Sequence, residues 1–151
     1  MKIKKESNEV EYNQNKLFIV DKKWIKRIKK KAINNSSKKF RTCIHFTKKD
    51  LVQEMLIVHT KDTVVKAHKH KKKNESILVL EGIALVKVYD NKGNIKKKFK
   101  IGEYKTGYPF FYKMKKNTFH SFKFLTKFFI FKETTQGPFN KDETIFAKWN
   151  S

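Results

Sequence analysis

Three histidines and a glutamate have the residue types of a metal site and, in part, its spacing. His68 and His70 lie two residues apart, and Glu75 follows after four intervening residues. On a β-strand, residues two apart project from the same face, so both imidazoles can reach one point. A tight turn over residues 71–74 would bring Glu75 beside them, and His120 could close the site from across a barrel. Imidazoles with a carboxylate suit divalent Zn, Fe, Mn or Ni, so the sequence predicts a divalent metal site.

A second interpretation of the same segment is a basic surface turn. Lysines flank the His-x-His pair, and an isolated pair of this kind is weak support for a metal. The residues after Glu75 favour the metal site, because an apolar run at 77–80 predicts a buried strand that a solvated turn would not need. His120 also has a second interpretation, as a histidine packed in the core.

The full spacing resembles the first signature of the cupin superfamily. That signature has His-x-His, four residues, Glu, six residues and Gly, and this chain matches it at His68, His70, Glu75 and Gly82. Asp62 stands where the signature begins with Gly. The resemblance implies an all-β cupin fold, which is a double-stranded β-helix or jelly-roll barrel, with His68, His70, Glu75 and His120 as metal ligands. Since cupins often pair through their sheets, it also implies a homodimer.

The second cupin signature is degenerate in this chain. His120 is retained, but Lys115 stands in place of its Pro and Phe124 in place of its Asn. Asn117 stands in place of its Gly, which is tolerable because Asn visits the left-handed backbone region. These departures weaken the assignment of His120 as a ligand and leave the fold prediction intact.

A closer resemblance, over about residues 20–150, is to the WbuC family. It rests on the metal-site cluster and four further segments, namely Arg41-Thr42-Cys43-Ile44-His45, Asp50-Leu51-Val52-Gln53-Glu54-Met55, Gln136-Gly137-Pro138-Phe139 and Phe146-Ala147 with Trp149. Members of that family are cupin-fold metalloproteins encoded with genes for surface-polysaccharide (O-antigen) biosynthesis. The resemblance therefore implies a metal-binding barrel and a setting in sugar metabolism, but no particular reaction.

Four further residues are candidates for the surroundings of the metal. Arg41 could clamp a phosphate or carboxylate of a substrate, or form a structural ion pair. His45 shares the parity of Arg41 and is the candidate catalytic acid or base, or a buried hydrogen-bonded histidine. Gln53 and Glu133 could bind substrate from inside the barrel, or lie on the solvent face of their strands.

The elements that must position these residues are mostly short strands. Asp21 is a plausible N-cap for a helix over 21–34, since Trp24, Ile28 and Ala32 recur at helical spacing. Residues 1–20 are predicted as a lead with a short strand at 17–20, followed by one cupin domain over 21–151. From residue 40 onward, strands are predicted at 41–46, 52–59, 63–70, 76–80, 83–89, 95–101, 109–114, 118–124, 128–132 and 145–149.

Composition limits the possible partners and locations. The net charge is +23, with 37 basic residues against 14 acidic ones. Such a charge attracts nucleic acid and phosphorylated molecules, but the lysines are scattered and arginine is nearly absent, which argues against nucleic acid as the partner. The sequence contains no apolar run long enough for a transmembrane helix, and its N-terminus lacks the apolar stretch of a signal peptide. With a single cysteine, Cys43, we expect a cytoplasmic protein.

Three kinds of function remain open at this stage. The first is an enzyme acting on a sugar or sugar nucleotide, in which the metal polarises a carbonyl during isomerisation or epimerisation, or serves as iron in a dioxygenase. The second is a non-catalytic module that binds a sugar or regulates another enzyme. The third is a basic nucleic-acid-binding β-barrel, which requires no metal and binds with steep salt dependence.

Overall fold

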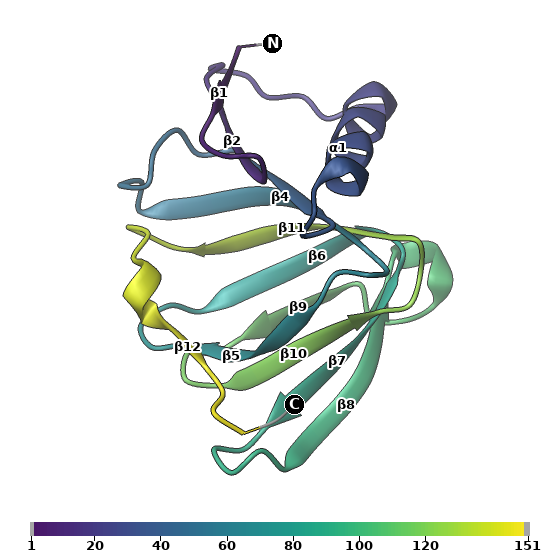
Figure 1. The fold of residues 1–151 in the computed structure, drawn as a ribbon, viewed down its shortest axis with the longest axis vertical. Coiled ribbons are helices and arrows are strands. Elements are labelled where there is room, and N and C mark those ends of the chain that lie inside the picture. The colour runs from purple at the N-terminus through teal and green to yellow at the C-terminus, as the bar shows by residue number, and fades with distance from the viewer. Residues whose placement is uncertain (1, 150–151) are drawn as a thin grey trace.

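The structure is a computed structural model that describes residues 2–149 (Figure 1). It contains one α-helix and many short strands. The bounds are β1 Ile3–Lys5, β2 Val10–Asn13, α1 Lys22–Asn34, β3 Lys39–Cys43, β4 Val52–Thr60, β5 Val65–His70, β6 Glu75–Glu81, β7 Ile83–Tyr89, β8 Ile95–Gly102, β9 Phe111–Met114, β10 Phe119–Phe124, β11 Phe128–Gln136 and β12 Thr144–Phe146, with short 3₁₀ turns at Tyr104–Thr106 and Lys141–Glu143.

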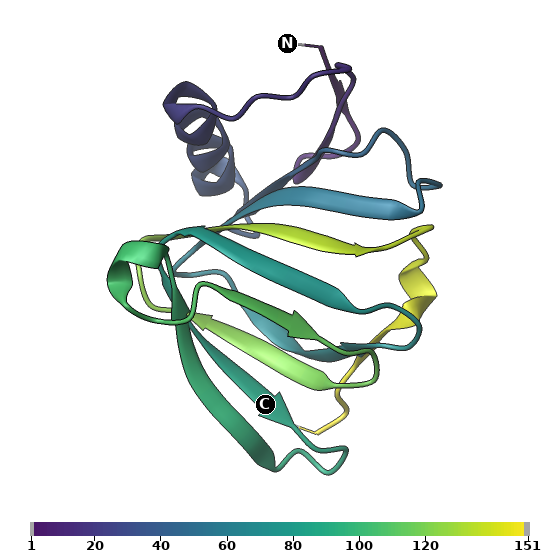
Figure 2. The ribbon, with the colours of Figure 1, turned by 180° about the vertical axis from the view of Figure 1, so that it is seen from behind.

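The strands form two sheets that face each other. The larger sheet has seven strands in the order β1-β2-β3-β4-β11-β6-β9, and the smaller has five in the order β12-β5-β10-β7-β8. Figures 1 and 2 show the sheets converging near the turn at residues 104–106 and spreading apart at the other end, where the segment before β12 runs from one sheet to the other. The two sheets are thus closer together at one end than at the other.

Alternation of side chains places the core between the sheets. In β6, Ile77 and Val79 are buried, and in β7 Ala84 and Val86 are buried, with partly exposed residues between them. These side chains pack together with others from both sheets in one cluster. Because successive strand residues point to opposite faces, this pattern also fixes which face the histidines of β5 and β10 present to the interior.

Helix α1 covers the outer face of the larger sheet. The side chain of Asp21 accepts a hydrogen bond from the backbone N–H of Trp24 at 2.7 Å, which is the predicted N-cap. Trp24, Ile28 and Ala32 are buried against a second cluster that includes Leu56 and Val58 of β4. The helix therefore supports the sheet from outside and lies away from the interior cavity.

The first twenty residues differ from the prediction. Residues 17–20 form no strand, and two strands, β1 and β2, precede them, with β2 running parallel to β3. Leu17 and Ile19 are exposed, and only Phe18 packs inward, against Trp24. The short apolar run therefore has no partner strand, whereas the more polar segments before it find one.

Two residues with positive φ shape turns beside the interior strands. Gly82 lies between β6 and β7, and Asn117 lies just before β10. Gly82 has φ of 86°, and a Cβ there would lie 2.1 Å from the carbonyl oxygen of Phe128, so only glycine fits. Asn117 has φ of 62°, as its place in the degenerate signature predicts, and its backbone N–H donates to the carbonyl of His70 at 2.7 Å. Asn117 thus joins the turn before β10 to the end of β5.

No helix in the described part of the chain is long and apolar enough to cross a membrane.

Candidate metal centre

The three histidines come together on the interior face of the smaller sheet. Strands β5 and β10 are antiparallel neighbours, and His120 lies directly opposite His68 in their register. His70 follows on the same face of β5. One ligand atom from each of the three rings lies within 4.8 Å of the others. His120 therefore reaches the site from the adjacent strand, and the expectation that it closes the site from across the barrel is wrong.

Glu75 reaches the histidines from the larger sheet. Residues 71–74 form the predicted turn, but the turn crosses between sheets, because β5 belongs to the smaller sheet and β6 to the larger. The carboxylate of Glu75 is 5% exposed. Its Oε2 lies 3.2 Å from His70 Nε2 and its Oε1 lies 2.8 Å from His120 Nε2. The four side chains predicted as ligands are therefore neighbours in space.

The second nitrogen of each ring is held by another group. His68 Nδ1 donates to the carbonyl of Lys66 at 2.9 Å, and His120 Nδ1 donates to the carbonyl of Thr118 at 3.0 Å. His70 Nδ1 lies 3.1 Å from the hydroxyl of Thr144, on β12. Since a carbonyl can only accept, Nδ1 carries the proton in the neutral forms of His68 and His120, and Nε2 is then the atom whose lone pair can bind a metal. This is the arrangement by which outer groups orient histidine ligands.

Electrostatics at the centre follow from burial and from the central carboxylate. Burial lowers the pKa of His68 to about 4, and the charge of His120 acts in the same direction, so this ring is neutral near pH 7. For His120, burial acts to lower the pKa, but Glu75 outweighs it and the pKa is raised. For Glu75, burial acts to raise the pKa, but the contacts with His120 and His70 outweigh it and hold the pKa well below its usual range.

The donor set fits a divalent cation. His120 Nε2 is buried without a hydrogen-bond partner, because its 2.8 Å approach to Glu75 has the distance of an ion pair but not the alignment of a hydrogen bond. That contact leaves the buried nitrogen incompletely satisfied, which is costly, and a cation between the rings and the carboxylate would bind both the Nε2 lone pair and the carboxylate. Three imidazoles and a carboxylate can hold Zn, Fe, Mn or Ni, so the cluster has the composition of a divalent metal site whose metal the structure does not identify.

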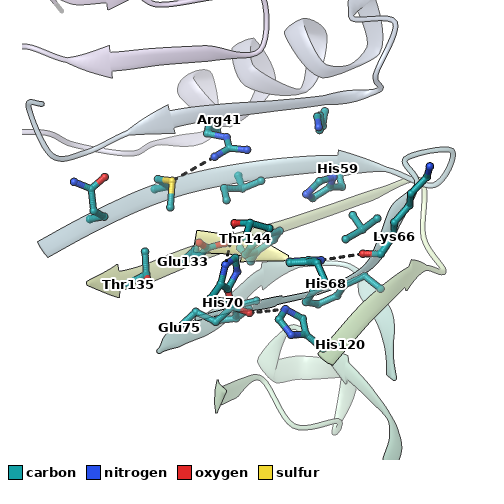
Figure 3. Close-up of a pocket in the computed structure, with 18 of the residues that line it drawn as sticks. Arg41, His59, Lys66, His68, His70, Glu75, His120, Glu133, Thr135 and Thr144 are labelled. Atoms are coloured by element: carbon teal, nitrogen blue, oxygen red, sulfur yellow. Dashed lines mark hydrogen bonds and ion pairs between the residues drawn. The ribbon is translucent and has the colours of Figure 1, made fainter. Parts of the chain in front are cut away.

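A cavity of about 510 Å³ lies above the cluster, between the two sheets. Figure 3 shows His68, His70, Glu75 and His120 on one side of it and Arg41 and His59 on the other. Its apolar lining includes Phe122, Phe124 and Phe131, and Phe139 and Phe146 contribute from the segment that crosses between the sheets. The volume is that of a pocket for a small molecule.

Arg41 and Glu133, both predicted as substrate-binding residues, line this cavity. Arg41 makes no ion pair with any described residue, and its guanidinium lies 3.8 Å from the sulfur of Met55. Burial raises the pKa of Glu133, and the charge of Glu75 raises it further. The alternative interpretation of Arg41 as half of a structural ion pair therefore finds no partner in the structure.

Gln53 lines the cavity but is engaged in the fold. Its Nε2 donates to the carbonyl of Asp50 at 2.8 Å, which fixes the turn before β4. A Cβ at Gly137 would lie 2.9 Å from the same nitrogen, so the segment after β11 packs closely on it. The amide that was predicted to bind substrate therefore ties two loops together.

His45, the predicted acid or base, does not line the cavity. Strand β3 ends at Cys43, so the parity that His45 was expected to share with Arg41 does not extend to it. Its Nδ1 contacts the carbonyl oxygen of Glu54 at 2.9 Å and the N–H of Glu54 at 3.0 Å, and its ring packs edge-on against Tyr12. This is the buried, hydrogen-bonded histidine of the alternative interpretation.

His59 is a cavity residue to which the sequence reasoning assigned no role. It lies near the end of β4, six residues after Gln53 and on the same face. The even spacing from Gln53 was the feature of the sequence that could have placed His59 on the interior face. Its position just before a turn concealed it, because strand ends are the least certain part of a sequence-based prediction. Thr144, which holds His70, had no signal in the sequence.

The chain was also compared with known proteins. A family model described as "Domain of unknown function (DUF6016)" matches residues 20–101. No curated protein matches the chain. Among solved structures, a protein from Shewanella oneidensis superposes with a TM-score of 0.60 at 10% identity, over 74% of this chain and 75% of its own.

Two oxalate decarboxylases are also similar in fold. The enzyme from Bacillus subtilis superposes with a TM-score of 0.52 at 19% identity, over 64% of this chain and 24% of its own. The enzyme from Lactobacillus farciminis gives 0.51 at 15% identity, over 64% and 27%. This chain thus spans about a quarter of the length of these decarboxylases. The likenesses confirm the predicted all-β cupin fold with one short helix.

Proposed function

The chain belongs to the family described as the domain of unknown function DUF6016, and because membership assigns no activity, we propose a function from the site itself. We propose a metal-dependent enzyme in which His68, His70, Glu75 and His120 hold one divalent ion, either Zn, Fe, Mn or Ni. The substrate that we propose is a sugar or sugar nucleotide, in the surface-polysaccharide setting that the resemblance to the WbuC family implies.

One observation gives the main support for the proposed metal site. Strand register and a crossing turn bring Nε2 of His70 and His120 onto one carboxylate, while backbone carbonyls hold Nδ1 of His68 and His120 in the protonated form. With their Nε2 protons removed, the rings would direct lone pairs at the point where the carboxylate also lies. The same lone pairs are what a divalent cation requires.

The neighbouring residues support chemistry on a small molecule. A divalent ion at this position would supply Lewis acidity toward a substrate carbonyl or, as iron, a centre for oxygen chemistry. Arg41 and Glu133 face the same cavity and can orient a substrate through charge and hydrogen bonding. The phenylalanines of the lining exclude water, which strengthens these polar contacts.

The test is elemental analysis of the untagged protein beside the double variant His68→Ala/His70→Ala. We expect about one metal ion per chain in the parent and none in the double variant, because two of the four donors are removed. A His45→Gln variant is the matched control, since it removes a buried histidine outside the cavity and should retain the metal. Circular dichroism would establish that each variant is folded.

The identity of the metal then selects the activity assays. Iron would direct the work to oxygen consumption, and zinc or manganese to isomerisation and epimerisation of keto-sugars and sugar nucleotides. A parent protein that takes up no metal, even after reconstitution with Fe, Mn, Ni and Zn, would contradict the proposal.

A further inference from the structure

We propose that Arg41 and His59 form an anion-binding subsite opposite the metal cluster, so that the substrate is a small molecule carrying a carboxylate or phosphate group. This inference rests on the proposed function for the role of the metal, but the subsite is built from other residues and can be tested alone. It names the chemical class of the substrate and adds His59 as a residue that determines specificity.

Arg41 differs from the other arginine in having no anionic partner. Arg27 donates two hydrogen bonds of 2.6 Å to the carboxylate of Glu11. Arg41 is half-buried in the cavity wall, and the only hydrogen-bond contact of its guanidinium within the described residues is with the sulfur of Met55. A guanidinium with a free fork, partly removed from water, is suited to bidentate binding of a carboxylate or phosphate.

Two carboxyl groups, Glu9 and Glu133, lie near enough to feel the charge of Arg41, but neither forms an ion pair with it among the described residues. Lys39, which precedes it on the same face of β3, is paired with Glu9 at 3.4 Å. Glu133 lies on the opposite side of β4 and forms no ion pair with Arg41 among the described residues. The guanidinium is therefore left for a ligand.

His59 adds a neutral polar group to this wall. Its side chain is about nine-tenths buried, and its Nδ1 has no hydrogen-bond partner. The ring stacks on Phe124 and Phe131, with centroids 4.6 Å and 5.7 Å away and interplanar angles of 10° and 7°. Burial, with Arg41 and Lys39 nearby, lowers its pKa to about 3, so the ring is uncharged near neutral pH. An orphaned nitrogen on a ring held so firmly is suited to a hydrogen bond with a ligand.

Strand register brings the two residues together. Arg41 pairs with Ile57 and Lys39 pairs with His59 across β3 and β4, which makes Arg41 and His59 diagonal neighbours on one face. In Figure 3 both lie along the wall formed by these strands, across from His68 and His70. The cavity of about 510 Å³, lined by both groups of residues, has room for a three- to six-carbon acid or sugar phosphate.

The experiment is calorimetric titration of metal-free and zinc-loaded protein with glycerol phosphate, with glycerate and with uncharged glycerol, in about 0.15 M salt to screen the surface lysines. The two acids separate phosphate from carboxylate recognition on similar skeletons. We expect one of them to bind both forms of the parent, and glycerol to bind neither. Arg41→Gln should weaken that binding by about tenfold or more, and His59→Phe by about threefold, since Phe keeps the stack but removes the nitrogen.

Two further variants make the result specific. Arg41→Lys keeps the positive charge but loses the parallel N–H donors of the guanidinium, so it should bind the anion more weakly than the parent. This variant keeps the test available if Arg41→Gln does not fold. Lys123→Gln removes the same unit of charge from an exposed position on the smaller sheet and should bind like the parent. Binding that is the same in Arg41→Lys and Arg41→Gln as in the parent would overturn the proposal, as would a parent that binds neither acid.

Zinc content measured on the same samples separates the two ideas. Anion binding that depends on Arg41 in a protein that takes up none of Fe, Mn, Ni and Zn would contradict the metal-dependent function and leave the subsite standing. Stoichiometric zinc with no anion binding would contradict the anion-binding subsite and leave the metal-dependent function standing.

Discussion

The two sheets carry their charge in different ways. In the five strands of the smaller sheet, histidines aside, every charged side chain is a lysine. The larger sheet has glutamates that are matched by cations, with Glu11 facing Arg27 and Lys31, Glu54 facing Lys132, and Glu81 facing Lys29. On the smaller sheet only one lysine has a carboxylate partner among the described residues, namely Lys96, whose Nζ lies 3.8 Å from Asp90 in the preceding turn.

The difference shows how each sheet uses charge. On the larger sheet, ion pairs fasten α1 and β2 to the strands beneath them. On the smaller sheet, Lys87 lies directly opposite Lys98 on its neighbouring strand, an arrangement that costs stability. The group of candidate metal ligands spans both sheets, since its imidazoles come from the smaller sheet and its carboxylate from the larger.

The largest expected effect comes from replacing Glu11, which tests whether the ion pairs of the larger sheet stabilise the fold. This carboxylate is 1% exposed and accepts hydrogen bonds from Arg27, Lys31 and Thr42. We expect Glu11→Gln to lower the free energy of unfolding by about 3 kcal/mol, because Gln has no charge and only one acceptor oxygen for the three partners of this buried carboxylate. Urea denaturation measures this. Glu9→Gln, at the more exposed pair with Lys39, should cost less than about 1 kcal/mol, and equal costs would remove the distinction between the pairs.

A second test uses pH on the metal-free protein. The pKa of His59 is lowered by burial from 6.5 to about 3, so between these values the unfolded chain binds a proton that the folded chain does not. Stability contributed by neutral His59 is therefore complete above about pH 6.5 and is lost as the pH falls, by about 2 kcal/mol at about pH 5.

Replacing His59 should remove that loss. In His59→Phe, the difference in unfolding free energy between about pH 7 and about pH 5 should be smaller than in the parent by about 2 kcal/mol. His120 on the smaller sheet has its pKa raised, so its contribution has the opposite sign and is lost as the pH rises through the folded value. An unchanged acid slope in His59→Phe would show that His59 titrates normally.

The smallest expected effect concerns the unmatched lysines. Lys87→Glu would place a carboxylate opposite Lys98, and we expect it to raise the free energy of unfolding by about 0.5 kcal/mol. Lys132→Glu on the larger sheet would face Glu54 and should lower it by a similar amount. The two changes remove the same charge, so shifts of the same sign in urea midpoints would mean that net charge, not local pairing, sets the response.

Much of the fold was predictable because its strands alternate. From residue 40 onward, the predicted strands agree with the observed ones to within a few residues, and the helix begins at its predicted cap. Strands β1 and β2 were missed because their sequences, Ile-Lys-Lys and Val-Glu-Tyr-Asn, are polar. Burial of Glu11 depends on cations from a distant helix, which no local pattern reveals.

The candidate site was predictable in part for the same reason. Spacing along one strand fixes how His68 and His70 lie, and the signature adds Glu75 and His120. The failure at His45 came from extending the alternation of β3 beyond Cys43, where the strand ends. The cytoplasmic location and the homodimer stay predictions.

The pairing of β12 with β5 has a consequence for the order in which the chain is made. Thr144 pairs with His70 and Phe146 with His68, so β5 has a partner on each side only when residues 144–146 are in place. On the ribosome, a nascent chain that has not yet reached residue 144 leaves β5 as a sheet edge with unsatisfied backbone groups, and His70 without the hydroxyl that holds it. Translation therefore supplies the support for His70 late, after most of the barrel has been synthesised.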